Sequence, residues 1–89
     1  MSVVEDCAQA FGAKYKNKPV GSLGTLGCFS LHPQKTVNDC GDGGLITTND
    51  PDIYRQLNML RNHGLLNRDE CITWDINSRL DTIHAAMLL

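Results

Sequence analysis

The sequence predicts an α/β fold, in which strands of a central sheet alternate with helices that cover it. Three short runs with apolar, aromatic or β-branched residues are typical of strands: Ser2–Glu5, Cys28–Leu31 and Leu45–Thr48. After the third run, Asn49-Asp50-Pro51 is a helix-start signal, because Asn or Asp caps free N–H groups and proline suits the first turn. An apolar stripe at helical spacing follows this signal. Strands and helices therefore alternate along the chain.

The first predicted strand, Ser2–Glu5, ends in consecutive acidic residues. This pattern is typical of a buried strand that delivers polar groups at its carboxyl end. The chain starts almost inside this strand, so we expect the sequence to be a piece of a larger domain. Cys7–Ala13 is predicted to form a short helix, and Lys14–Pro19 an exposed basic turn.

Glycines recur every third residue from Gly21 to Gly27. The spacing resembles a phosphate-binding loop, but the Lys-Ser/Thr ending and the following helix are both missing. We therefore interpret this segment as a connector. The strand Cys28–Leu31 should end at His32-Pro33, because proline lacks a ladder donor. Lys35 then lies in a loop, and Gly41–Gly44 forms a turn before the third strand.

The helix that starts at Asn49-Asp50-Pro51 should run to Asn62 or His63, with Gly64 as its stop. Leu65–Trp74 is predicted to be irregular, and a last helix should begin near Ser78 and continue to a chain end without a cap. The apolar stripe of the first helix comprises Ile53, Leu57 and Leu60, with Tyr54 and Met59 alongside. Three strands are few for an independent core, so we expect them to belong to one larger sheet.

Composition and charge exclude several classes of protein. The 89 residues carry eight Lys and Arg against ten Asp and Glu, a formal net charge of −2, which provides no basic field for nucleic acid or anionic membranes. No apolar run approaches the roughly 18 residues that span a bilayer, and the N-terminus lacks a basic region followed by an apolar core. A cytoplasmic protein without a membrane or nucleic-acid partner is expected.

The four cysteines, Cys7, Cys28, Cys40 and Cys71, are widely scattered and form no C-x-x-C pair. They are interpreted as buried or incidental thiols of a reducing compartment, and no metal site is expected. A zinc-binding module is the weakest alternative, because its ligands would have no paired spacing.

Asp6 and Gln9 are three residues apart just after the first strand, where α/β sheets commonly expose functional groups. A carboxylate there keeps its charge beside a cationic partner, such as a protonated heterocyclic nitrogen. The alternative, which local sequence favours, is that Asp6 caps the Cys7–Ala13 helix.

Lys35 lies between Ser30 and His32 on one side and a glycine-rich turn on the other. A lysine held near cations or out of water loses its proton more easily, and the neutral amine can attack a carbonyl to form a Schiff base. Most lysines, however, are solvated surface charges, so the residue alone favours that interpretation of Lys35. His63 and His84 are interpreted as a helix-terminal and a core-edge residue.

The order of these segments resembles the DegT/DnrJ/EryC1/StrS family of sugar aminotransferases over nearly the whole chain. Several motifs at compatible spacing carry the resemblance, and together they are far more specific than any one of them. They are Glu5-Asp6-Cys7-Ala8-Gln9-Ala10, Gly21-Ser22-Leu23-Gly24, Cys28-Phe29-Ser30-Leu31-His32-Pro33-Gln34-Lys35, Gly41-Asp42-Gly43-Gly44, Leu60-Arg61-Asn62-His63-Gly64 and Asn77-Ser78-Arg79-Leu80-Asp81, ending at Ala85-Ala86.

The resemblance implies a role for five residues. Lys35 matches the lysine that forms the internal aldimine with pyridoxal 5′-phosphate. Asp6 matches the carboxylate that pairs with the pyridine nitrogen, and Gln9 matches a residue that contacts the ring or its phenolic oxygen. Ser30 matches a hydroxyl that binds the cofactor phosphate. Asn77 matches an amide that reaches the phosphate of the neighbouring subunit, which implies a homodimer or higher oligomer.

The implied fold is a portion, residues 1–89, of the large domain of an aspartate-aminotransferase-type (fold type I) transferase, with a mostly parallel sheet and flanking helices. The implied reaction transfers an amino group, usually from glutamate, to a nucleotide-linked keto-deoxysugar. Family members are several times longer, so we expect an N-terminal part and a C-terminal domain to be absent and the isolated chain to be inactive.

One departure from the family pattern and two alternatives stand beside this interpretation. The sequence from Lys35 to Cys40 differs from the one more common in the family after the lysine, which leaves the substrate subtype open. The chain could be a stand-alone non-catalytic remnant that associates through exposed apolar faces. Some relatives have dehydrating or regulatory roles, but the dehydrating branch carries histidine in place of the lysine, so Lys35 argues against it.

Overall fold

The computed structural model describes all 89 residues. They fall into two compact units, residues 1–49 together with 80–89, and residues 50–79. The first unit contains the sheet and four of the five predicted site residues, and the second contains the longer helix.

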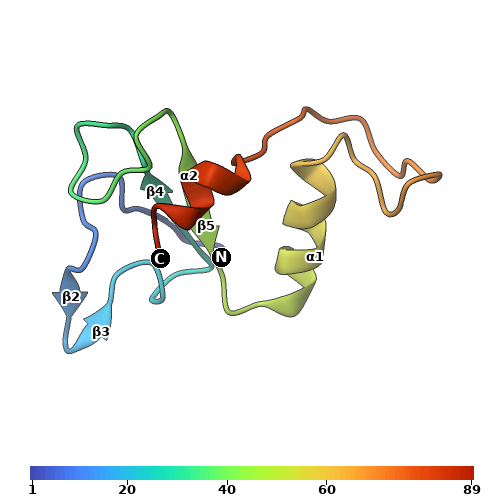
Figure 1. Ribbon diagram of the computed structural model, residues 1–89. Helices are drawn as coiled ribbons and strands as arrows, with labels where there is room; N and C mark the ends of the chain where they lie inside the picture. Colours follow the sequence, from blue (N-terminus) through green and yellow to red (C-terminus); the bar gives the residue numbers. More distant parts are fainter. The chain divides into compact units, whose positions relative to one another are not determined.

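The sheet of the first unit has three strands, β1 (Val4–Asp6), β4 (Leu26–Ser30) and β5 (Gly44–Thr47), with β4 between the other two (Figure 1). All three strands coincide with the predicted runs to within two residues. β1 pairs with β4 in parallel and β4 pairs with β5 antiparallel. The sheet is thus mixed, and the mostly parallel sheet expected of a larger domain stays a prediction.

The register divides the sheet into two faces, because residues directly opposite one another point to the same side. Glu5 pairs with Gly27 and Phe29 pairs with Leu45, which places them on one face. The other face carries Val4, Asp6, Cys28, Ser30 and Ile46. Val4 and Ile46 on this second face are 60% and 52% exposed, so β1 is not the buried strand that its apolar run predicted.

The glycine-rich connector covers the first face and is folded around one carboxylate. Glu5 accepts hydrogen bonds from the backbone N–H groups of Gly21 at 2.8 Å, Leu23 at 2.8 Å and Gly24 at 2.6 Å. These bonds lower the pKa of Glu5 below 4.5, with the Gly24 N–H as the largest cause. The N–H groups that a phosphate loop would offer to a ligand are therefore bound to Glu5, which supports the interpretation as a connector.

The prediction of a helix over Cys7–Ala13 is wrong. The Cys7 N–H continues the sheet ladder by donating to Cys28 O at 2.8 Å, and two turns follow instead of a helix. Gly12 has φ +80°, which no right-handed helix accommodates, and the Phe11 ring packs edge-on against Phe29 with centroids 5.7 Å apart. Tertiary contact with the sheet thus overrides the local helical preference.

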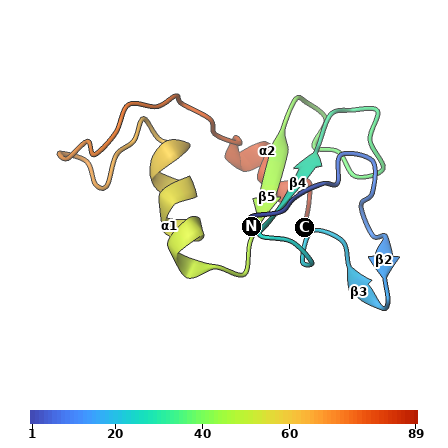
Figure 2. The same ribbon diagram turned by 180° about the vertical axis from the view of Figure 1, so that it is seen from behind.

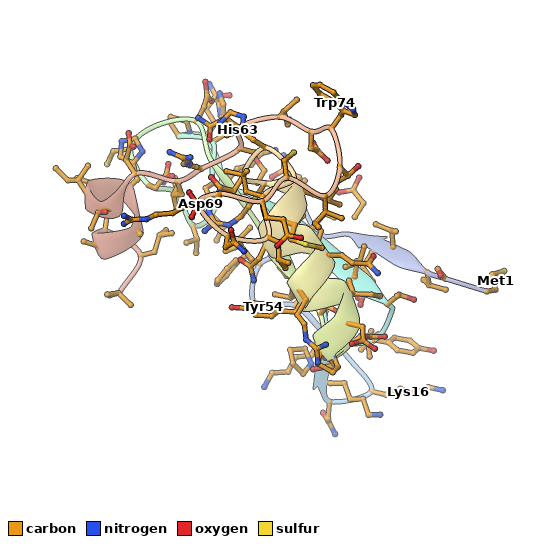
Figure 3. All side chains as sticks on the ribbon, turned by 90° about the vertical axis from the view of Figure 1, so that its right-hand side faces the viewer. Met1, Lys16, Tyr54, His63, Asp69 and Trp74 are labelled. Carbon is orange, nitrogen blue, oxygen red and sulfur yellow. The ribbon has the colours of Figure 1, made fainter.

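The basic turn at Lys14–Pro19 is a small hairpin of β2 (Lys14–Tyr15) and β3 (Lys18–Pro19). Lys16 and Asn17 between the strands both have positive φ, 47° and 64°, which matches the twist of a two-residue hairpin turn. All residues of the hairpin are exposed, as expected, and Figure 3 shows Lys16 at its tip.

In the second unit, α1 (Pro51–Leu60) begins where the sequence predicts. The Asp50 carboxylate accepts from the N–H groups of Asp52 at 2.8 Å and Ile53 at 3.2 Å. The helix ends two or three residues earlier than expected, at Leu60, and His63 and Gly64 follow in left-handed conformations. The Gly64 N–H closes the end by donating to Met59 O at 2.9 Å, which confirms the predicted stop.

Residues 61–79 fold back on themselves without a helix or a regular strand, as predicted for Leu65–Trp74. Backbone bridges join Asn62 to Asn77 and Leu65 to Cys71. The last helix, α2 (Thr82–Ala86), belongs to the first unit and starts four residues later than predicted. The residues before it are tied to the end of α1 instead, because Asn77 bridges to Asn62 and the Ser78 N–H donates to Arg61 O at 2.9 Å.

Few side chains are fully buried, and they are Cys7, Leu31 and Asp39 of the first unit. They lie at or just beyond the carboxyl ends of β1 and β4, the end from which the loop of residues 32–43 emerges (Figures 1 and 2). Neither helix has the length and the apolar content needed to cross a membrane.

Candidate functional site

The carboxyl ends of β1 and β4 bring Asp6 and Ser30 to one edge and one face of the sheet. Asp6, the last residue of β1, pairs in register with Cys28 of β4. Ser30 follows Cys28 by two residues on the same face, about 6.6 Å further along the strand at the usual rise. The Asp6 carboxylate and the Ser30 hydroxyl therefore belong to the same face of the sheet.

The Asp6 carboxylate accepts a hydrogen bond from the Ala8 N–H at 3.1 Å through Oδ1. Asp6 therefore closes a turn, and the alternative in which it caps a helix is wrong because no helix follows. Its other oxygen remains available for a ligand, since the side chain is exposed. Gln9 lies in the same turn region and is exposed.

Lys35 is held in a tight turn that leaves the end of β4. The Lys35 N–H donates to His32 O at 2.8 Å, and Pro33 occupies the position that proline favours in such a turn. On the other side, Asn38 Nδ2 donates to the Lys35 carbonyl at 3.4 Å. Both backbone polar groups of Lys35 are thus bonded, and the residue is half-buried. The predicted placement of Lys35 in a loop is confirmed.

Asp39 anchors the far end of this loop and was not singled out from the sequence. It is fully buried, its N–H donates to Leu31 O at 3.4 Å, and its Oδ1 accepts from the Gly41 N–H at 3.1 Å. Its Oδ2 is buried without a hydrogen-bond partner and lies against Gly43. Nothing in the local pattern distinguishes this aspartate from the exposed Asp42 nearby, so only the folded structure reveals it.

Helix α2 packs on the same loop through His84. A side chain at Gly41 would meet the imidazole of His84, with Cε1 at 2.9 Å, and one at Gly43 would meet Leu80 Cδ1 at 2.9 Å. His84 is half-buried, which confirms its interpretation as a core-edge residue. The glycines of this turn therefore serve close packing against α2 as well as backbone freedom.

Asn77 belongs to the second unit and is exposed. Its backbone bridges to Asn62, and Arg79 Nη2 donates to Asn62 Oδ1 at 2.6 Å, which fixes the segment around Asn77. His63, in the same unit, donates its N–H to Ile76 O at 3.0 Å just beyond α1, so the helix-terminal interpretation of His63 is confirmed.

The cysteines are free thiols in different surroundings. Burial, followed by the nearby charges of Glu5 and Asp6, raises the pKa of the Cys7 thiol, so this thiol is held in its unreactive protonated form. No group of three or more His, Cys, Asp or Glu side chains is placed to hold a metal ion. The arrangement of the thiols gives the zinc alternative no support.

The donor set at the strand ends fits pyridoxal 5′-phosphate. This cofactor needs a primary amine for its aldehyde, a carboxylate for its pyridine nitrogen and donors for its phosphate. Lys35, Asp6 and Ser30 of the first unit carry an amine, a carboxylate and a hydroxyl, so their chemistry is compatible with this cofactor. The buried Asp39 carboxylate is not part of the set, because it holds the loop from the inside.

Comparison with known proteins assigns the chain to one family. The model of the DegT/DnrJ/EryC1/StrS aminotransferase family matches residues 1–89, and the chain belongs to this family. It is 50% identical over 88 residues to dTDP-3-amino-3,6-dideoxy-alpha-D-galactopyranose transaminase of Aneurinibacillus thermoaerophilus, a match that covers 99% of this chain and 24% of the relative. The chain spans about a quarter of the length of the curated relatives that it matches.

Solved structures agree with this assignment. A family aminotransferase from Brucella abortus superposes with a TM-score of 0.93 at 38% identity, over 98% of this chain and 24% of that one. A protein of Streptococcus pneumoniae, assigned as a sugar aminotransferase and solved in its PLP form, superposes with a TM-score of 0.84 at 26% identity, over the same shares. The mixed three-stranded sheet therefore matches a part of the fold of these aminotransferases.

Proposed function

We propose that this chain is the cofactor-anchoring part of a pyridoxal-phosphate-dependent aminotransferase that acts on a nucleotide-linked keto sugar, with glutamate as the amino donor. The observation that supports the proposal is the turn that holds Lys35 just beyond the end of β4, the strand that carries Ser30 and pairs with the strand of Asp6. The named activity of the relative from Aneurinibacillus thermoaerophilus supports the substrate class.

Each of the predicted residues has a task in this proposal. Lys35 would hold the cofactor through its amine, and the same amine, when free, would carry a proton. Asp6 accepts a hydrogen bond from the protonated pyridine nitrogen through its exposed carboxylate, and Ser30 donates its hydroxyl hydrogen to the phosphate. Gln9 contacts the ring. When bound, the cofactor supplies an electron sink for the carbanion formed at the substrate carbon.

The 89 residues alone are proposed to bind the cofactor without catalysing transamination. Asp6 and Gln9 are exposed and Lys35 is half-buried, so water has access to each of the groups that would contact the ring. Transamination requires a water-excluding site in which the reacting atoms are held together. We therefore expect no transfer from glutamate to a nucleotide-linked keto sugar by the chain by itself.

Association of two chains is also proposed. The loop that carries Asn77 exposes four large apolar side chains, and Trp74, which projects from the ribbon in Figure 3, is 98% exposed. Such a group of apolar side chains favours an interface with a second chain, where Asn77 would reach the neighbouring cofactor phosphate. The four side chains are Leu66, Ile72, Trp74 and Ile76. A cytoplasmic location stays a prediction.

A non-catalytic association module is the second candidate function, and the same exposed loop favours it. The dehydrating role receives no support, because Lys35 is present. The two candidates differ in one property, which is whether the edge formed by β1 and β4 binds the cofactor.

The proposal is tested by titrating the chain with pyridoxal 5′-phosphate and following the absorbance change of its aldehyde on reaction with an amine. Lys35→Ala should abolish saturable binding. Lys18→Ala, which removes an exposed lysine of the hairpin, serves as the matched control and should bind like the parent chain. Equal binding by the parent and both variants would show random reaction with surface lysines and would contradict the proposal.

A further inference from the structure

His32 connects two residues of the proposed cofactor site through its backbone, and its side chain contacts the two turns on either side. Its backbone N–H donates to Ser30 Oγ at 3.3 Å, and its carbonyl accepts from the Lys35 N–H at 2.8 Å. In the side chain, Nδ1 accepts from the Gln34 N–H at 3.2 Å, while Nε2 lies 3.9 Å from Asp42 Oδ1.

These contacts fix the tautomer of the neutral His32 imidazole. A ring nitrogen that accepts a hydrogen bond carries no proton, so in the neutral ring the proton is on Nε2, the nitrogen that faces Asp42. The ring thus bonds to the turn that carries Lys35 and faces the glycine-rich turn that carries Asp42. Those two turns are also joined through the backbone, because the Leu31 N–H donates to Gly43 O at 2.8 Å.

The bond to Ser30 has a second consequence. Since the His32 N–H uses a lone pair of Ser30 Oγ, the hydroxyl hydrogen stays free to donate to another acceptor. In the proposed function that acceptor is the cofactor phosphate. One residue therefore orients both the hydroxyl at the end of β4 and the lysine five residues later.

We propose that His32 is a positioning residue that holds the Lys35 turn in the geometry needed for reaction with the cofactor aldehyde, through the acceptor at Nδ1. The inference rests on the proposed function, in which Lys35 is the amine that reacts. His32 itself touches neither the aldehyde nor the substrate in this role. Its effect is on the effective concentration of the lysine amine near the bound cofactor.

Two substitutions distinguish the effect of the hydrogen-bond acceptor at Nδ1 from the effect of the ring itself. His32→Phe keeps a planar ring of similar size and removes the acceptor. His32→Asn removes the ring and keeps an oxygen that can accept from the N–H two residues on, as in an Asx turn. His32 is an exposed residue, so neither change removes a buried contact.

The test compares labelling of the parent chain and both variants by limiting pyridoxal 5′-phosphate, followed by borohydride reduction and peptide mapping. Labelling of Lys35 is expressed relative to the exposed Lys14 and Lys18 of the same chain. His32→Phe should lower this ratio about three- to tenfold, the range that the loss of one hydrogen bond gives. His32→Asn should stay within about twofold of the parent.

Hydrogen exchange of the Gln34 and Lys35 amides provides a readout that needs no cofactor. Both amides should exchange about three- to tenfold faster in His32→Phe and at the parent rate in His32→Asn. Unchanged exchange in both variants, or an equal increase in both, would overturn the inference. If the exchange pattern holds while Lys35 of the parent is not labelled preferentially, the positioning of the turn stands and the proposed function fails.

Discussion

Gly27 is the position where a single added methyl group tests the packing of the connector on the sheet. A Cβ at Gly27 would overlap Gly21 Cα and would lie 2.7 Å from Thr47 Oγ1 and 2.9 Å from Gly21 O. Carbon contacts are optimal at about 3.5–4.0 Å, so the connector has to move away from β4. That movement acts on Gly21, whose N–H is bound by Glu5 and whose carbonyl accepts from Thr47 Oγ1 at 2.5 Å.

The expected cost of Gly27→Ala is about 1–3 kcal/mol, the range for extra atoms in a closely packed site. With a urea dependence of about 1 kcal/mol per M for a small chain, the unfolding midpoint should fall by roughly 1–3 M. The assay is urea unfolding followed by far-ultraviolet circular dichroism.

Gly44→Ala is the matched control in the neighbouring strand. A Cβ there meets only Phe29 O, at 3.1 Å, so its cost should stay within about 0.5 kcal/mol. If both substitutions shift the midpoint equally, or if Gly27→Ala is tolerated, the packing of the connector described above is incorrect.

Two further predictions concern charge and association. Glu5→Gln should destabilise the chain at neutral pH. The folded pKa of Glu5 is lowered below 4.5, so the parent should be more stable than the variant above pH 4.5. This difference in stability should be lost as the pH falls through the folded pKa. Urea midpoints measured at neutral and at acid pH check this, and a gap between parent and variant that does not narrow on acidification would contradict it. Trp74→Ser should weaken self-association at least several-fold in sedimentation equilibrium, because the 98% exposed indole is the largest apolar group of the loop. The exposed Tyr54→Ser on α1 is its control, and an equal effect of both substitutions would remove the loop from the interface.

Local sequence patterns predicted those parts of the structure that depend on a few neighbouring residues. The start of α1 follows from Asp50 and Pro51, because a cap is satisfied within its own turn. The turn that carries Lys35 follows from Pro33 for the same reason.

Contacts between distant residues decided the parts that the sequence did not predict. Cys7–Ala13 has helical propensity, but the Phe11 ring and the Cys7 N–H are used by β4. The roles of Glu5 and Asp39 also depend on distant or folded surroundings, since Glu5 binds residues 16 to 19 positions away. A signal for Glu5 was present, because glycines at every third residue offer N–H groups that some anion must bind.

The late start of α2 has the same origin. Residues 77–79 have no local reason to avoid a helix, but Ser78 is paired with Arg61, and Arg79 is bonded to Asn62. Periodicity alone therefore placed the beginning of this helix four residues too early.

The central claim, that Lys35 anchors pyridoxal 5′-phosphate, is tested most directly by trapping. The chain is mixed with an equimolar amount of the cofactor, reduced with borohydride and digested, and the modified peptide is identified by mass. The account predicts one adduct, on Lys35, although Lys14, Lys16 and Lys18 are all more exposed to solvent. An adduct distributed over the hairpin lysines, with Lys35 labelled no more than the others, would contradict it.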